Sequence, residues 1–196
     1  NNDDNILIYD NSNLRSSCRC WFSLLYFGDD EKKIHILNGG LKKWVFENKP
    51  LTKNKTEITE SNYVANEKKN LVVNIDQIKM NIQKKNFNVI DARSRERYEG
   101  KVSEPRKGLR SGHIKNSFCL PFNKCIDQKT GEFKNLEELR ELFNYHESFE
   151  KKLDPVFTCG SGVTASVLAY AYKMINNDYI PKIYDGSWSE YGKYPA

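Results

Sequence analysis

The 196-residue sequence lacks any apolar run that approaches the roughly 20 residues of a membrane-spanning helix. It also lacks a long block of like charge, because its 31 basic and 26 acidic residues are interspersed and leave a formal net charge of +5. The first absence argues against a membrane protein and the second against a nucleic-acid-binding arm. We therefore expect a soluble globular protein whose mild positive field suits a small anionic substrate.

Cysteine is sparse and irregularly placed. The chain has five cysteines, an odd number, and no signal peptide is recognisable. This predicts free thiols in a reducing compartment, cytoplasmic or mitochondrial. Cys18 and Cys20 have the spacing of a metal-binding pair, but no second Cys/His pair lies nearby, so ordinary helical positions are favoured. No metal, nucleotide or flavin signature occurs, and no cofactor is expected.

The sequence does contain a repeated order of elements. Each copy consists of an apolar strand, a polar or Gly-rich loop, a helix, a second strand, a glycine turn and an aromatic residue. The first loop begins with Asp10, whereas the second begins with Cys159. This pattern predicts a duplicated domain whose first copy has lost its nucleophile. In the first copy the predicted strand, helix and second strand are residues 6–10, 16–27 and 34–37. In the second copy they are residues 155–159, 164–176 and 182–184.

The two copies are separated by a polar segment, residues 51–70, which is rich in Lys, Asn and Glu and predicts a linker. Residues 1–50 then form one partial unit and residues 71–196 a complete domain. Strands alternate with helices in the complete domain, which is typical of an α/β fold with a mainly parallel sheet. Its further predicted elements are helices at 75–84 and 136–143, a helical turn at 94–98, and strands at 87–91 and 117–120.

Cys159 occupies a position suited to chemistry. It ends a predicted buried strand and precedes a helix, and sites in parallel sheets form at the carboxyl ends of strands. Gly160 and Gly162 allow the loop to curl with its N–H groups inward. Inward N–H groups and the helix dipole stabilise a thiolate or a persulfide anion. Taken alone, the same pattern is equally compatible with a buried structural cysteine.

Two arginines extend this hypothesis. Arg97 and Arg106 follow the predicted strand that ends at Asp91-Ala92-Arg93, and two guanidinium groups facing one pocket suit a small carboxylate. Each arginine by itself is more typical of a solvated surface residue. His113 is interpreted as a structural residue, hydrogen-bonded beneath the loop, rather than as a base.

Five motifs occur in order along the second part of the chain: Asp91-Ala92-Arg93, Glu104-Pro105-Arg106-x-Gly108, Gly112-His113-Ile114, Cys159-Gly160-Ser161-Gly162-Val163-Thr164-Ala165 and Tyr184-Asp185-Gly186-Ser187-Trp188. Together they resemble the C-terminal domain of 3-mercaptopyruvate sulfurtransferases, relatives of thiosulfate sulfurtransferase (rhodanese). The resemblance covers residues 71–196, and residues 6–50 resemble the second half of the family's inactive N-terminal rhodanese domain. It implies a rhodanese-like open parallel sheet flanked by helices.

The resemblance also implies roles for single residues. Cys159 matches the persulfide-forming nucleophile, and Ser161 matches a loop serine in the proton network around the sulfur. The implied donor is 3-mercaptopyruvate, with thiosulfate poorer because positions 160 and 161 carry no basic pair, and the implied acceptors are thioredoxin, glutathione or cyanide. Arg97 and Arg106 match the arginines that hold the substrate carboxylate and carbonyl, and Gly160, Ser161, Gly162, Val163 and Thr164 match the loop whose N–H groups cradle the sulfur.

The chain departs from the family at its start. It opens on Asn rather than Met and directly on a strand, which suggests a fragment or a processed chain. In relatives an acidic residue and a histidine from the earlier part support the catalytic serine, and neither is assigned here. We expect residues 6–50 either to be completed by another chain or to leave apolar surface exposed.

Two alternatives compete with sulfur transfer. Phosphatases and arsenate reductases of related fold build their cysteine loop around an arginine, whereas Ala165 stands at that position and no Arg or Lys lies between Cys159 and Lys173. The other alternative is a catalytically silent rhodanese-like module that serves assembly or regulation. Cys159 together with both arginines argues against silence.

Overall fold

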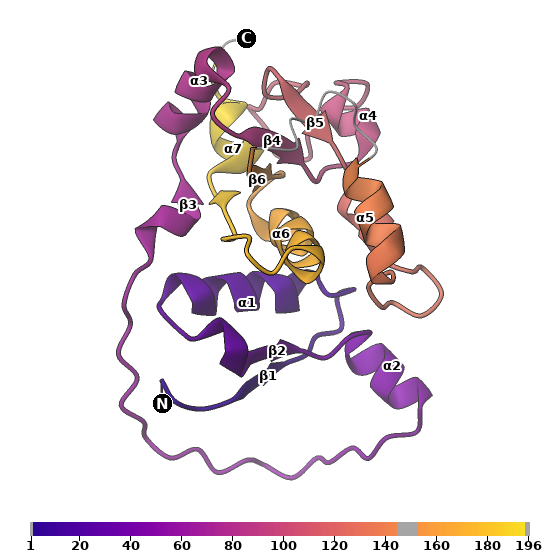
Figure 1. Cartoon of the computed structure of the whole chain (residues 1–196). Coiled ribbons are helices and arrows are strands. Elements are labelled where there is room, and N and C mark those ends of the chain that lie inside the picture. Colours follow the sequence, from indigo (N-terminus) through magenta and orange to yellow (C-terminus); the bar gives the residue numbers. More distant parts are fainter. Residues whose placement is uncertain (1, 145–152, 195–196) are drawn as a thin grey trace.

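The computed structural model describes residues 2–144 and 153–194, which contain two parallel sheets. The smaller sheet belongs to the first unit (residues 2–50) and the larger one to the second unit (residues 69–144 and 153–194), as Figure 1 shows. In the first unit, strands β1 (Ile6–Ile8) and β2 (Ile34–Ile36) pair in parallel, and helices α1 (Arg15–Tyr26) and α2 (Gly40–Phe46) follow them. Short 3-10 turns occur at Glu31–Lys33, Lys69–Leu71 and Phe122–Cys125.

The second unit contains a five-stranded sheet in the order β3-β7-β6-β4-β5, and every strand pair in it is parallel. The chain alternates between this sheet and its helices, so successive strands are joined by crossover connections. The predicted parallel α/β fold is confirmed. Its elements are β3 (Val72–Val73), α3 (Ile75–Lys84), β4 (Asn88–Asp91), α4 (Arg95–Tyr98), β5 (Ser117–Cys119), α5 (Leu136–Asn144), β6 (Pro155–Thr158), α6 (Val163–Ile175), β7 (Ile183–Tyr184) and α7 (Ser187–Tyr191).

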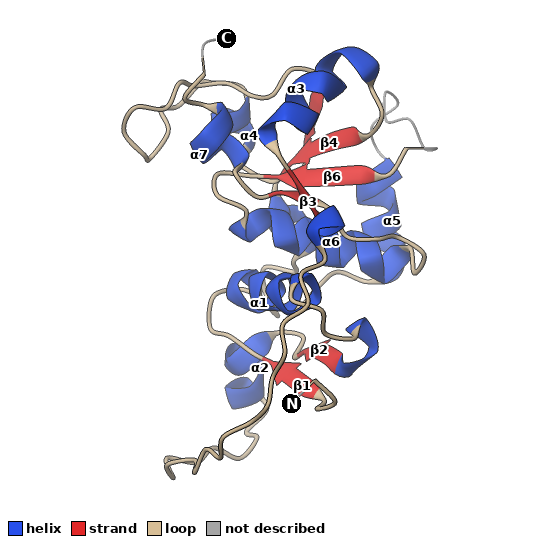
Figure 2. Ribbon diagram, turned by 90° about the vertical axis from the view of Figure 1, so that its left-hand side faces the viewer, coloured by secondary structure: helices blue, strands red, loops and turns tan. Residues whose placement is uncertain are grey.

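Both faces of the larger sheet are covered, which explains why its central strands are apolar throughout. Side chains alternate along a strand, so Val156 of β6 faces a core with α3 and α7 while Phe157 faces the core formed with α5 and α6. Figure 2 shows the layers in sequence: α3, the large sheet, α6, α1 and finally the small sheet. Helix α6 is therefore buried on two sides, between its own sheet and the first unit.

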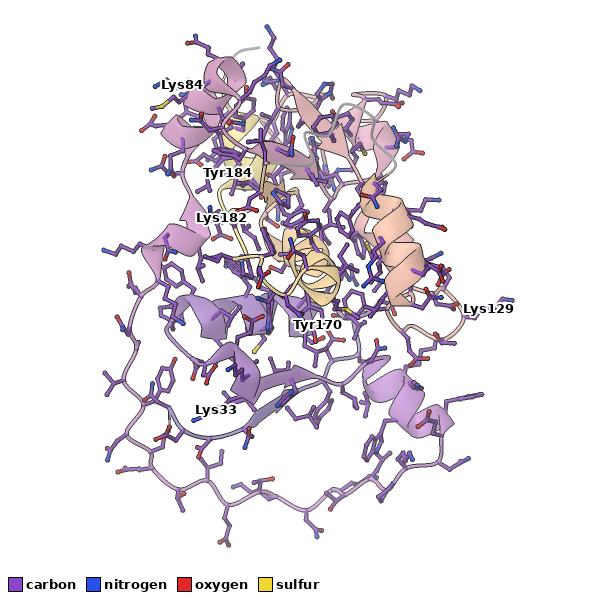
Figure 3. The ribbon with its side chains drawn as sticks, viewed as in Figure 1. Lys33, Lys84, Lys129, Tyr170, Lys182 and Tyr184 are labelled. Atoms are coloured by element: carbon purple, nitrogen blue, oxygen red, sulfur yellow. The ribbon has the colours of Figure 1, made fainter. Side chains whose placement is uncertain are left out.

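The first unit shares its core with the second. Helix α1 packs along α6, and Trp21 of α1 meets Tyr170 of α6 edge to face with ring centroids 4.9 Å apart. Figure 3 shows Tyr170 on the side of α6 that faces the first unit. The apolar residues of α1 belong to the same buried cluster as those of α6 and β6, so residue 50 does not mark the edge of a separate core.

The side of the small sheet that faces away from α1 is exposed. Leu7 and Tyr9 are exposed there, and a pocket lies between β1 and the chain that follows α2. This agrees with the exposed apolar surface that the sequence predicts for residues 6–50. The pocket is lined by Leu7, Tyr9, Leu37, Leu41, Trp44, Pro50, Leu51 and Thr52.

Residues 51–67 contain no helix or strand, in agreement with a linker, and Figure 1 shows them running around the first unit. The second half of this segment is nevertheless attached. Asn66 N–H donates to Phe27 C=O at 2.7 Å, and the Tyr63 hydroxyl donates to Asp29 at 2.6 Å. The linker is therefore fastened to the first unit before it enters β3.

Candidate active site

Cys159 follows β6 directly and lies at the carboxyl edge of the large sheet, 2% exposed. Its Sγ accepts the N–H of Ser161 at 3.4 Å, and this is the one backbone donor to the sulfur in the described residues. Gly162 has φ of +81°, which lets the chain turn back and begin α6 at Val163. Cys159 thus sits in a curled loop at the N-terminus of α6, with its sulfur directed at a backbone N–H.

The hydroxyl of Ser187 holds this loop from beneath. Its Oγ accepts the N–H of Cys159 at 3.2 Å and that of Gly162 at 3.0 Å, and it donates to Tyr184 C=O at 2.9 Å. Ser187 is fully buried and adopts φ of +51°, a conformation unusual for a residue with a side chain. Ser187 carries no predicted role beyond its place in a motif. The Gly162 N–H, which was expected to face the sulfur, donates to this hydroxyl instead.

The two candidate substrate arginines meet at Gly160. A methyl group placed on Gly160 would lie 3.0 Å from Arg97 Nη2 and 3.6 Å from Arg106 Nη1. Both guanidinium groups therefore lie over the residue next to the nucleophile, although they come from α4 and from the loop after it. Arg106 is exposed and makes no ion pair within the described part of the chain, so its donors are available to an anion.

A buried ion network holds Arg97 in place. Arg97 donates to Glu104 Oε1 at 3.2 Å and to its Oε2 at 2.5 Å, and Arg93 donates to the same carboxylate at 2.9 Å. Arg93 also forks onto Asp91, and both side chains are almost completely buried. These carboxylates hold the pKa of Arg93 above its usual value against the opposing effect of burial. Asp91-Ala92-Arg93 therefore orients Arg97 through Glu104 from a buried position.

Trp188 links this network to the nucleophile loop. Its backbone N–H donates to Cys159 C=O at 2.9 Å, and its ring contacts two guanidinium groups. The Arg93 Cζ is 4.3 Å and the Arg110 Cζ 4.7 Å from the ring centroid, distances typical of cation–π contacts. Trp188 therefore contacts Arg93 through its ring and the Cys159 loop through its backbone.

Burial makes the other thiols poor nucleophiles. It raises the pKa of Cys119 to about 11 and that of Cys125 to about 12, and it raises the pKa of Cys18 and Cys20 as well. Cys119 Sγ donates to Arg93 C=O at 3.8 Å, whereas Cys159 Sγ accepts a backbone N–H. This contact distinguishes Cys159 from Cys119 as the candidate nucleophile.

Cys18 and Cys20 lie on helix α1, which agrees with the prediction that they occupy ordinary helical positions. Cys18 is buried and Cys20 is exposed. Within residues 2–144 and 153–194 no cluster of three or more His, Cys, Asp or Glu side chains could hold a metal ion. In the same residues, none of the helices is long and apolar enough to span a membrane.

The remaining site residues lie as follows. Val163 and Thr164 form the first turn of α6, and Ala165, the position of an arginine in phosphatase loops, is fully buried beneath it. His113 Nδ1–H donates a hydrogen bond to Tyr98 C=O at 2.9 Å, and its ring stacks on the Tyr98 ring, so it supports α4 and does not lie beneath the Cys159 loop.

The first loop of the repeat has the same backbone frame. Leu41 N–H donates to Asp10 C=O as Trp188 N–H does to Cys159 C=O, both at 2.9 Å. Ser12 N–H donates to the Asp10 carboxylate at 3.2 Å, the counterpart of the bond from Ser161 to the Cys159 sulfur. Further N–H groups, from Leu14 and Ser17, also donate to Asp10. In the first loop these donors surround a carboxylate, which indicates that a loop of this shape holds an anion.

The fold and this loop define a rhodanese-like domain, and the chain belongs to that family. The family model described as "Rhodanese-like domain" matches residues 74–194. It is 34% identical over 193 residues to 3-mercaptopyruvate sulfurtransferase of Escherichia coli (strain K12), an alignment that covers 98% of this chain and 66% of that protein. It is also 34% identical over 196 residues to thiosulfate sulfurtransferase of Gallus gallus, covering 97% of this chain and 64% of the relative.

A solved structure agrees with these relatives. The crystal structure of SseA from Escherichia coli, described as a 3-mercaptopyruvate sulfotransferase with the rhodanese fold, has a TM-score of 0.82 at 32% identity. The match covers 97% of this chain and 69% of that one. The chain spans less than two thirds of the length of the curated relatives.

Proposed function

We propose that the protein is a sulfurtransferase that moves sulfur from 3-mercaptopyruvate to a thiol or cyanide through a persulfide on Cys159. The observation that carries this proposal is the convergence of Arg97 and Arg106 on Gly160, next to a thiol whose sulfur accepts a loop N–H. Two guanidinium groups at that distance suit the carboxylate and carbonyl of a 2-oxo acid. The family and the named relatives support the same activity.

The reaction has two half-reactions. The Cys159 thiolate attacks the sulfur of 3-mercaptopyruvate, the carbon–sulfur bond breaks, and the electron pair leaves with the enolate of pyruvate, which takes up a proton. An acceptor thiolate then attacks the outer sulfur of the persulfide and restores the Cys159 thiolate. Thioredoxin and glutathione are acceptors of the required chemistry, and the scheme is covalent, ping-pong catalysis.

The loop composition favours one donor over another. Gly160 and Ser161 place no cation directly after the nucleophile, so the dianion thiosulfate lacks a matching charge there. A side chain at 160 would also press against Arg97. We therefore place 3-mercaptopyruvate before thiosulfate, and rates with the two donors on one sample measure this order.

The central test replaces the nucleophile. Cys159→Ser should abolish pyruvate release from 3-mercaptopyruvate, and the wild-type chain should gain the mass of one sulfur on the peptide that contains Cys159. Cys20→Ser is the matched control, because Cys20 is the exposed thiol of α1, and it should leave both readouts unchanged. A wild-type chain that gains no sulfur after incubation with the donor would contradict the proposal.

A catalytically weak or silent module is the second candidate, and one observation favours it. The Ser161 hydroxyl has no hydrogen-bond partner in the described part of the chain, so nothing there completes a proton relay at the sulfur. Pyruvate release indistinguishable between wild type and Cys159→Ser would support this candidate.

The free cysteines suit a reducing compartment, and we place the protein in the cytoplasm or the mitochondrion.

A further inference from the structure

One ion pair connects the first unit to the nucleophile loop. Arg19, on α1, forks onto Asp185, which follows β7: Nη1 pairs with Oδ1, and Nη2 lies 3.4 Å from Oδ2. The two side chains are partly exposed, 33% and 40%. The pair lies at the seam between the units, beside a pocket to which Phe22 and Val72 also contribute.

The ion pair rests directly on Gly162. A methyl group on Gly162 would collide with the Asp185 carboxylate and would lie 2.8 Å from Arg19 Nη1. The same glycine is fixed at its N–H by Ser187 and at its C=O by Ser166, whose hydroxyl donates at 3.1 Å. Both polar backbone groups of Gly162 are therefore hydrogen-bonded, and Arg19 of the first unit lies beside this glycine.

Other ion pairs between the units lie away from the loop. Glu31 pairs with Lys173 at 3.0 Å near the C-terminal end of α6, and Lys43 of α2 pairs with Glu132. They brace the same interface, yet neither Lys173 nor Glu132 is near Gly160 or Gly162 among the described contacts. These pairs provide a natural comparison for Arg19.

We propose that Arg19 is a positioning residue for the nucleophile: through Asp185 it fixes Gly162, and with it the curl and the charge balance of the Cys159 loop. The first unit, whose own loop carries Asp10, thereby contributes to the reaction of the second. The inference rests on the proposed sulfur transfer only for its turnover readout, because the state of the loop is measurable through the thiol alone.

The two charges of the pair make opposite contributions at the loop. Among the described residues, the charged groups nearest to the two loop glycines are Arg97 and Arg106 at Gly160, and Arg19 and Asp185 at Gly162. Without Arg19, the Asp185 carboxylate beside the loop disfavours a thiolate, and without the Asp185 charge the Arg19 cation favours one. A purely mechanical brace would change both variants in the same direction.

The experiment uses the full chain and the pH profile of iodoacetamide alkylation, followed by mass spectrometry of the peptide that contains Cys159. Arg19→Gln should move the alkylation midpoint upward by about 0.5 pH unit and Asp185→Asn downward by a similar amount, the scale of a partly exposed pair. Arg19→Lys keeps the charge and should stay near the wild-type midpoint. Lys43→Gln removes an inter-unit ion pair distant from the loop and should leave the midpoint unchanged.

Sulfur loading from 3-mercaptopyruvate is measured on the same variants and should slow by about tenfold in Arg19→Gln, equivalent to about 1.4 kcal/mol. Midpoints that stay fixed, or that move in the same direction in both variants, would overturn the inference. If Arg19→Gln does not fold, Asp185→Asn and Arg19→Lys decide the question. Opposite midpoint shifts in a chain that loads no sulfur would uphold the positioning role and reject the proposed function.

Discussion

The Ser187 hydroxyl satisfies two loop N–H groups that would otherwise be buried without an acceptor. Ser187 itself is held in a left-handed backbone conformation, which costs conformational free energy for any residue other than glycine. The surrounding contacts must therefore outweigh that cost. The bond to Tyr184 C=O shows how they do so, because it ties the same hydroxyl to the end of β7.

Replacing this hydroxyl should damage both stability and reaction. Ser187→Ala leaves two buried N–H groups unpaired, so we expect a loss of about 2 to 3 kcal/mol in the free energy of unfolding. Sulfur loading should fall by about tenfold because the loop loses its curl. Urea unfolding and single-turnover loading measure the two effects.

Ser189→Ala is the matched control, since the Ser189 hydroxyl donates only to Gly186 C=O and does not touch the loop. Equal losses in the two variants would show that the Ser187 hydroxyl has no special part in the site.

The sequence could predict the residues of the site that carry a motif, and it could not predict those that act through backbone contacts. Cys159, Arg97 and Arg106 were singled out by residue type and order, and the structure brings the three together. The part played by Ser187 depends on its hydroxyl reaching two N–H groups 25 and 28 residues away, which no local pattern reveals. Glu104 was recognised only as part of a motif, because its link to Arg97 depends on burial.

At the scale of elements, the connection from β1 to α1 is stabilised by an internal carboxylate. Partial burial by itself raises the pKa of Asp10, but hydrogen bonds from Ser17 and Ser12 outweigh this effect and hold the pKa below its usual value. A lowered folded-state pKa means that the unfolded chain binds protons more readily at acidic pH. The contribution of Asp10 is therefore present above its unfolded pKa, near 4, and is lost as the pH falls through its folded value.

Asp10→Asn should make this dependence visible. The variant should be less stable than wild type at pH 7, and the difference should shrink as the pH is lowered below about 4, where the native carboxyl becomes protonated. Denaturant unfolding at several pH values is the measurement. Asp30→Asn, which alters an exposed carboxylate that caps a short turn, is the comparison and should show little change. A stability difference that stays constant with pH would contradict the role of the charge.

Element boundaries were predicted to within one or two residues where an apolar period defined them. The helix predicted at 75–84 has those bounds, and a capping box between Asn74 and Gln77 explains its clean start. Helices α2 and α7 were interpreted only as glycine turns followed by an aromatic residue. They are short and begin at positive-φ positions, Gly40 and Ser187, so neither has the apolar repeat that identifies a helix.

For the whole molecule, the packing of α1 on α6 predicts a graded pattern of hydrogen exchange. Amides of Cys18 to Leu25 should exchange about as slowly as those of α6, because both helices share one core. Amides at 51–62 should exchange fastest, and those of β1 should fall between, because Leu7 and Tyr9 are exposed. Mass spectrometry of the intact chain after timed labelling measures this order. Fast exchange throughout α1 would show that the two units separate readily.

Sequence composition predicts a linker at 51–70, but it could not show that the units on either side share a core. The polar stretch at 51–70 suggests independence, whereas the contact between Trp21 and Tyr170 joins residues 149 positions apart. Pairings of that range depend on how two helix faces fit, and either face alone looks like an ordinary amphipathic surface. The domain boundaries at 50 and 71 therefore remain predictions, and they do not imply that the two units fold independently.

The carboxylate of Asp10 also has a meaning in terms of ligand binding. A group covalently attached within its own loop behaves as a tethered ligand, present at an effective concentration far above that of a free metabolite. No dissolved anion would displace it, so the first loop is permanently saturated. The second loop carries a thiol in the same frame, and a thiol can gain a sulfur atom and give it up again. In one chain, the same backbone design thus holds a fixed charge in one copy and, in the proposed reaction, an exchangeable sulfur atom in the other.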